Sequence, residues 1–307
     1  MSDDRPSPGV AKRAAPFVLF ALTVVSVMHT GAGYVGEGGS AWRGWTFAVP
    51  LLTILVSHEL GHYVAARLHG VPASLPHFLP LPILSPFGTA GAIIGMTSRI
   101  ASRRALLDIG AAGPLAGMVF ALPLLAIGLA LSEVKPASSP SLIEGDSLLY
   151  LAMKAAFAKP IPPGHDVYLH PTAFAGWTGL FLTMVNLLPI GQLDGGHVAY
   201  ALLGDRANTL GKWLHRGLLA LFVVNATRNV LRARAHGFTS DTVITAVSNS
   251  TFWLLWFGLT ALVLRASGGV HPPTDDGESL GPLRRAIAVV CLSLFVLLFM
   301  ATPLRVE

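Results

Sequence analysis

Charge and cysteine are both scarce in this chain of 307 residues. Asp, Glu, Lys and Arg together make up 12% of it, whereas apolar residues make up 52%. Soluble proteins carry roughly twice that share of charge. A chain of this length cannot bury so much apolar surface in one aqueous globule, so the composition excludes an ordinary soluble domain. It predicts an integral, multi-pass membrane protein in contact with the lipid bilayer.

Several functional classes are excluded by what is missing. The single cysteine, Cys291, rules out an internal disulfide and a thiolate zinc cluster. We find no phosphate-binding loop, nucleophile elbow, internal repeat or low-complexity segment. The net charge of +5 comes from Lys and Arg near the ends of apolar runs, which is typical of membrane-flanking charge. We therefore expect no nucleic-acid partner.

Seven apolar segments follow a polar, proline-containing stretch, 1–13, which we expect to be a disordered tail. The fifth segment carries Asn and Arg near its end, so six to seven membrane helices are predicted. The fold class expected from this pattern is an all-α polytopic membrane protein. The predicted helices are 14–34, 45–68, 105–131, 172–188, 213–231, 251–264 and 286–300.

The connection after the second predicted helix is apolar but irregular. Residues 71–88 contain five prolines, which excludes a regular helix. The stretch Thr89–Thr97 that follows is short and contains glycine, as expected for a strand or hairpin. Irregular backbone at membrane depth is tolerated where protein buries it or where it lines a cavity. We predict a re-entrant loop or β-hairpin over 70–104, with an interfacial loop that has no role as the alternative.

The second predicted helix contains the motif Ser-His-Glu-Leu-Gly-His at 57–62. His58 and His62 lie four residues apart on one helix face, which suits two imidazole nitrogens on one tetrahedral Zn²⁺. Glu59 follows the first ligand, where this motif places the base that deprotonates the catalytic water. Ionisable groups inside an apolar span are costly, so this location indicates a functional site rather than a solvated surface.

A third zinc ligand must come from another part of the chain. Asp194 is the best candidate, because it is acidic in an apolar region and Pro189 with nearby glycines would break the helix before it. A helix-capping role for Asp194 and a ligand role for His197 are the alternatives. Asp108, near the start of the third predicted helix, fits a polar interface better than a partner of a metal ligand.

Three motifs in this order resemble the site-2 protease family of intramembrane zinc metalloproteases: His-Glu-Leu-Gly-His, Gly-Ala-Ala-Gly-Pro and Asn-x-x-Pro-x-x-x-Leu-Asp-Gly. The stretch 87–95 and the late His271-Pro-Pro are similar to its compact branch, which has no PDZ or CBS domain. The resemblance implies a six-helix-type core with a β-hairpin near the site. It also implies one Zn²⁺ per chain on His58, His62 and Asp194, Glu59 as base, and Asn186 assisting near the scissile carbonyl.

The expected function is a zinc-dependent intramembrane endopeptidase that cleaves transmembrane segments of membrane proteins, in a single membrane-embedded domain over 14–303. An edge strand would accept the unwound substrate. Its expected contact residues are Gly88, Gly91, Ala92, Ile93 and Ile94. A metal-ion transporter is disfavoured because a hydrolytic base follows the first ligand and no half of the chain is repeated. A catalytically silent scaffold is disfavoured because all four essential residues are present.

Basic residues gather near the ends of most apolar segments, at 12–13, 67, 99–104, 206–216 and 284–285. Lys and Arg mark the cytoplasmic side of membrane helices. We therefore predict that the active site lies nearer the cytoplasmic face, and we expect the membrane to be a bacterial inner membrane. Arg228, Arg232 and Arg234 fit this orientation poorly if 213–231 crosses the membrane. The sequence assigns neither the substrate nor the oligomeric state.

Overall fold

The computed structural model describes residues 10–35, 41–96, 100–136, 142–235, 237, 239–274 and 279–306. Most of the expected tail, 1–9, lies outside the described residues, as do Thr97 and Arg99. The helices are α1 Val10–Gly33, η1 Ala41–Gly44, α2 Trp45–Leu68, α3 Arg103–Leu131, α4 Leu148–Phe157, α5 Pro171–Asn186, α6 Asp194–Leu203, α7 Arg206–Ala235, α8 Ser240–Ser248, α9 Thr251–Ala266 and α10 Pro282–Leu298. The strands are β1 His77–Pro80, β2 Thr89–Ile93, β3 Glu133–Pro136, β4 Leu142–Glu144, β5 His165–Tyr168 and β6 Leu304–Val306.

Every predicted membrane segment coincides with a helix, and within the described residues four helical stretches are long and apolar enough to cross a membrane. These are Ala14–Gly33, Trp42–Leu68, Arg103–Leu131 and Thr242–Ala266. Helices α5 and α10 have 16 and 17 residues, somewhat fewer than the roughly 20 that span a bilayer. Helix α7 is long enough, with 30 residues, but several Arg and Asn side chains interrupt its apolar surface. The protein is an integral membrane protein, and the number of six to seven crossings stays a prediction.

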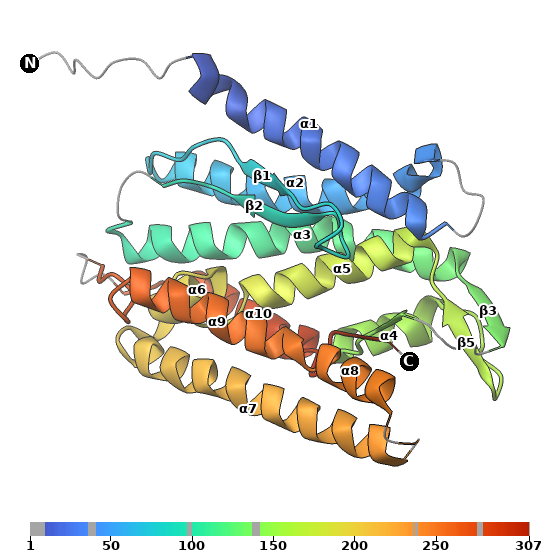
Figure 1. Cartoon of the computed structure of the whole chain (residues 1–307). Coiled ribbons are helices and arrows are strands. Elements are labelled where there is room, and N and C mark those ends of the chain that lie inside the picture. Colours follow the sequence, from blue (N-terminus) through green and yellow to red (C-terminus); the bar gives the residue numbers. More distant parts are fainter. Residues whose placement is uncertain are drawn as a thin grey trace, which may run out of the picture.

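The long helices lie side by side, with α1 at one side of the molecule and α7 at the other (Figure 1). Helix α3 occupies the middle and packs against α2, α5 and α6. Glycines allow these close approaches. A Cβ on Gly61 would come within 2.5 Å of the Ala112 carbonyl oxygen, and one on Gly128 within 2.1 Å of the Ala173 nitrogen. Small residues at helix contacts are the usual means of tight packing in membrane proteins.

Three short antiparallel sheets accompany the helices, so the protein is mostly helical rather than all-α. Strands β1 and β2 form the expected hairpin. Strand β3 pairs with β5, and β4 pairs with β6, in segments for which we predicted no strand. Strands of three or four residues are too short for the two-residue alternation of polar and apolar residues to show in the sequence.

The β1–β2 hairpin packs beneath α1, between it and the centre of the molecule (Figure 1). The ring of Phe78 in β1 contacts the ring of Phe20 in α1, with 5.1 Å between their centroids. The register shifts between Phe78 and Pro80. Gly91 lies opposite this irregularity with a φ of +89°, a conformation that residues with a side chain rarely adopt. The hairpin is therefore kinked within β2, directly before Ala92.

Candidate metal centre

The α2 helix brings its two motif histidines together in the interior. His58 and His62 are buried, at 5% and 8% exposure, and their Nε2 atoms lie 3.1 Å apart. A hydrogen bond across this contact needs one protonated and one unprotonated Nε2. A metal ion would instead bind one lone pair from each Nε2, so the contact suits a pair of metal ligands. The spacing of four residues predicted this convergence correctly.

The third donor arrives where the chain breaks between α5 and α6. Helix α5 ends at Asn186, and α6 begins at Asp194. Gly195 and Gly196 let α6 start directly against the preceding turn, because a Cβ on either would lie 1.9 Å or 2.2 Å from a backbone oxygen. The Asp194 carboxylate oxygen Oδ2 is thereby placed 3.3 Å from His58 Nε2 and 3.2 Å from His62 Nε2.

The three donor atoms fit a tetrahedral metal. Zinc bonds of about 2.0–2.1 Å to nitrogen and oxygen imply roughly 3.3–3.4 Å between neighbouring ligand atoms. The three separations found here are 3.1, 3.2 and 3.3 Å. His58, His62 and Asp194 thus form one face of a tetrahedron, and in the described part of the chain they are the group that meets the geometry of a metal site. The donor set of two imidazoles and one carboxylate suits Zn²⁺.

Helix α3 orients the His62 ring through a hydrogen bond to its Nδ1 atom. The ring nitrogen Nδ1 lies 2.8 Å from the Ile109 carbonyl oxygen, and because that oxygen only accepts, Nδ1 carries the hydrogen. Nε2 is then free to bind a metal, as in most histidine-ligated sites. Gly113 leaves space for the ring, since a Cβ there would lie 2.1 Å from His62 Nε2. Gly117 does the same beside His58, at 3.3 Å from its Cβ.

A cavity of about 880 Å³ opens onto the three donors. Glu59 lines it, although the residue as a whole is only 7% exposed. Asn186 lines it as well, and its Nδ2 lies 3.2 Å from His58 Nε2. The base and the assisting amide expected from the sequence therefore share one cavity with the predicted ligands.

Part of the predicted substrate-binding stretch borders the same cavity. Ala92, Ile93 and Ile94 line it, whereas Gly88 and Gly91 are not among the described residues that do. Gly88 is instead packed against α1, where its carbonyl oxygen accepts a hydrogen bond from Ser26 Oγ. The Gly88 carbonyl oxygen is therefore already bonded within the protein, and a substrate contact at Gly88 stays a prediction. Gly91 instead provides the positive φ at the kink in β2.

Sequence reasoning missed the partners of two residues near the centre, His197 and Asp108. His197 is not grouped with the three donors, because its Nδ1 bonds to His271 Nε2 at 2.7 Å. His271 Nδ1 donates to the Pro272 carbonyl oxygen, and burial lowers the pKa of the His271 imidazole. The second residue is Asp108, which binds Arg284 and His69. These partners lie 39 to 176 residues away, so no local pattern announces them.

Comparison with known proteins supplies the family. The model of peptidase family M50 matches residues 46–224, more than half of the chain. The chain belongs to this family. Family M50 is the site-2 protease family, so the resemblance of the three motifs is confirmed, together with the assignment to the zinc metalloproteases and the predicted zinc cofactor.

Curated relatives of this M50 chain are plant proteins. Probable zinc metalloprotease EGY1, chloroplastic, of Arabidopsis thaliana is 37% identical over 166 residues, 52% of this chain and 30% of that protein. Probable zinc metalloprotease EGY2, chloroplastic, of Oryza sativa subsp. japonica is 29% identical over 57% of this chain and 32% of its own. EGY3 of the same subspecies is 28% identical over 90% of this chain. The chain spans less than half the length of these relatives, and no solved structure matches it.

Removal of the third donor tests the metal centre. We expect Asp194→Ala to lose or scramble the metal, because two imidazoles alone leave a tetrahedral ion without its third protein ligand. Metal content of the purified chain, measured by elemental analysis after dialysis, reports the loss. Asp205→Ala is the matched control, since it removes an exposed carboxylate just beyond the other end of α6. Stoichiometric zinc with unchanged affinity in the Asp194 variant would transfer the ligand role to another residue, His197 first.

Proposed function

We propose that this chain is a zinc-dependent intramembrane endopeptidase that cleaves transmembrane segments of membrane proteins, as in regulated intramembrane proteolysis. The observation that carries the proposal is a tetrahedral donor face with an adjacent buried carboxylate, and two of its three donors and that carboxylate lie in an apolar helix long enough to cross a membrane. When bound, zinc supplies Lewis-acid polarisation of the scissile carbonyl and lowers the pKa of a water molecule.

Two protein residues, Glu59 and Asn186, carry out the remaining steps of hydrolysis. Glu59 takes a proton from the attacking water at its carboxylate and later gives a proton to the leaving amine nitrogen. Its place in the turn between the two ligand histidines keeps that carboxylate within the cavity. The Asn186 amide, 3.2 Å from a metal-facing nitrogen, donates a hydrogen bond to the carbonyl oxygen as negative charge develops there. Neither residue is needed to hold the metal.

Substrate docks along the open edge of β2. A transmembrane helix satisfies its carbonyl groups internally, so it must unwind before attack, and an exposed strand edge offers replacement hydrogen bonds. Among the described residues β2 pairs with β1 alone. Ala92, Ile93 and Ile94 border the cavity that contains the donors. Recognition through the main chain tolerates many side chains, which suits a protease of unwound helices.

The site belongs to one membrane-embedded domain. The expected range, 14–303, is extended by α1 from Val10 and by β6 to Val306, which pairs with β4. The hairpin region acts as a re-entrant element, because apolar irregular backbone beside the site needs protein or a cavity around it. The site lies near the Arg67 end of α2, on the side that we assign to the cytoplasm of a bacterial cell. The named relatives are chloroplastic, so the comparisons do not favour the bacterial membrane.

Metal transport is the rival proposal. Histidine and carboxylate groups within a span also mark ion pathways. A transporter has no need for a base in the turn between two ligands, nor for an open strand edge bordering the same cavity. A catalytically silent scaffold would need neither the base nor the amide at Asn186. Hydrolysis accounts for all of these groups together.

Replacement of the base separates the three functions. We expect Glu59→Gln to keep its zinc and to lose about 10²–10⁴-fold in cleavage rate, because a general base typically contributes that much. The parent and the variant are reconstituted with detergent-solubilised membrane proteins, and new fragments are counted by mass spectrometry. Glu133→Gln, on exposed strand β3, is the control. Zinc flux into vesicles without any cleavage by the parent would favour transport, and neither activity would favour a scaffold.

The amide at Asn186 has its own test. We expect Asn186→Ala to retain zinc and to cleave about 10²–10³-fold more slowly, which is the usual cost of removing an oxyanion donor. Single-turnover rates on one fragmented membrane protein from the previous assay give this value. Gln192→Ala is a suitable control, because Gln192 borders the same cavity but lies in the turn before α6. Near-normal turnover with normal zinc in the Asn186 variant would end the assignment.

The docking edge is tested most sharply at Ile94. The Gly95 N–H donates to Ser74 Oγ at 2.9 Å, and successive N–H groups of an extended chain point to opposite edges, so the Ile94 N–H faces the open edge. Ile94→Pro removes that donor, and Ile94→Val changes the side chain but keeps it. We expect only the proline variant to cleave slowly, with parental zinc in both. Parental cleavage by Ile94→Pro would place substrate docking elsewhere.

A further inference from the structure

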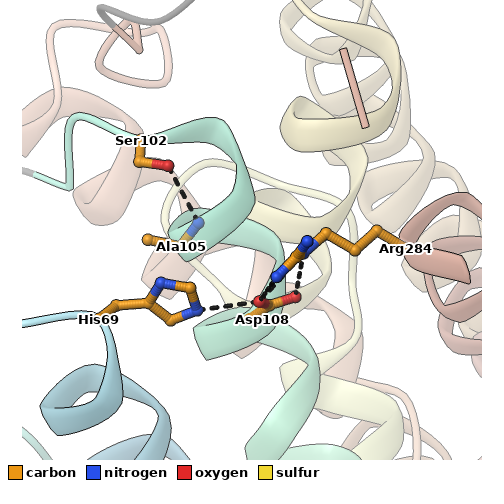
Figure 2. A network of polar contacts seen from close by, with 5 residues as sticks. All are labelled: His69, Ser102, Ala105, Asp108 and Arg284. Carbon is orange, nitrogen blue, oxygen red and sulfur yellow. Dashed lines mark hydrogen bonds and ion pairs between the residues drawn. The ribbon is translucent and has the colours of Figure 1, made fainter. Parts of the chain in front are cut away.

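The Asp108 carboxylate joins the ends of three helices, α2, α3 and α10 (Figure 2). Asp108 Oδ2 accepts from Arg284 Nη2 at 2.7 Å, and Arg284 Nε adds a bond to Oδ1 at 3.0 Å. The same Oδ2 lies 2.9 Å from Nε2 of His69. Asp108 is in the second turn of α3, His69 caps the C-terminus of α2, and Arg284 is in the first turn of α10. The group fixes where these three helix ends lie relative to one another.

The network reaches the metal centre through the next residue along α3. Ile109 is fully buried, and its carbonyl oxygen accepts from His62 Nδ1 at 2.8 Å. One turn further, Gly113 bounds the His62 ring so closely that a Cβ would lie 2.1 Å from Nε2. Residues 108–113 of α3 therefore determine the position of the His62 imidazole, and Asp108 fixes the N-terminal end of this segment.

We propose that Asp108 is a positioning residue for the metal centre, holding α3 so that the Ile109 carbonyl fixes the orientation of His62. The inference rests on the proposed function, because it takes His62 to be a metal ligand. The residues of the network are partly exposed, with side-chain exposures of 23% for Asp108, 27% for His69 and 35% for Arg284. Ion pairs at such positions contribute little to stability, whereas a bidentate Arg–carboxylate pair specifies geometry.

The competing explanation is that the network only fastens helices and has no effect on the metal. A matched group elsewhere in the chain separates the two. Glu144 Oε1 accepts from Tyr150 Oη at 2.7 Å and from Lys154 Nζ at 3.2 Å, with 11% side-chain exposure. Both partners belong to α4, which lies at the end of the molecule opposite the α2 C-terminus (Figure 1). Replacing Glu144 disturbs a comparable polar group without changing residues 108–113, which contact His62.

The experiment compares the full chain, Asp108→Asn and Glu144→Gln in the same detergent. Zinc affinity is measured by competition with a chromophoric chelator, and Co²⁺ is loaded in place of zinc for visible spectra, which report ligand geometry. We expect Asp108→Asn to bind zinc about 10–100-fold more weakly, the usual cost of losing an outer partner of a metal ligand. Its Co²⁺ spectrum should also shift. Glu144→Gln should match the parent in both measurements.

Arg284→Lys provides a second variant that keeps the charge but loses the planar fork, and we expect an intermediate loss of affinity. It carries the test if Asp108→Asn does not fold. Parental affinity and spectrum in the Asp108 and Arg284 variants, or equal changes in Glu144→Gln, would overturn the inference. A parent that binds no metal would instead overturn the metal centre of the proposed function, and this inference with it. Neither readout depends on cleavage of a substrate.

Discussion

The convergence of two imidazoles and one carboxylate inside an apolar helix bundle is the constraint on which the rest of the structure depends. Buried polar groups cost several kcal/mol unless a partner satisfies them, and ionisable groups at membrane depth are costlier still. The ligand atoms of His58, His62 and Asp194 lie within 3.1–3.3 Å of one another, so they need shared protons or a cation between them. A divalent ion turns this crowding into coordination. The arrangement of the three side chains therefore suits a bound divalent ion.

That convergence demands unusually close helix packing, and α3 provides it. Gly110 accommodates α6 beside Asp194, Gly113 accommodates the His62 ring, and Gly117 accommodates His58. The three glycines occur at spacings of three and four residues, so they share one face of α3. This glycine face of α3, which begins with the Gly-Ala-Ala-Gly-Pro motif and ends at Gly117, therefore packs against His58, His62 and the start of α6. A larger side chain on this face would displace a ligand, whatever its effect on helix stability.

The hairpin connects the metal centre to its proposed substrate. It is held from outside by α1, through Phe20 and Ser26, and faces the cavity through Ala92 and its successors. Its backbone is satisfied on the β1 side and open on the other among the described residues. An unsatisfied strand edge at membrane depth is as costly as an unpaired donor in a core. Under the proposed function, an unwound segment that pairs with this edge would relieve that cost.

The sequence alone determined the features that depend on neighbouring residues. The helical positions of the apolar segments, the pairing of His58 with His62, and the break before Asp194 all follow from local spacing and from proline and glycine. Only the tertiary structure decided that Gly88 faces α1 while Ala92 faces the cavity, and that Asp108 meets His69 and Arg284. Such contacts join residues up to 176 positions apart, and helix packing sets them rather than any period in the sequence.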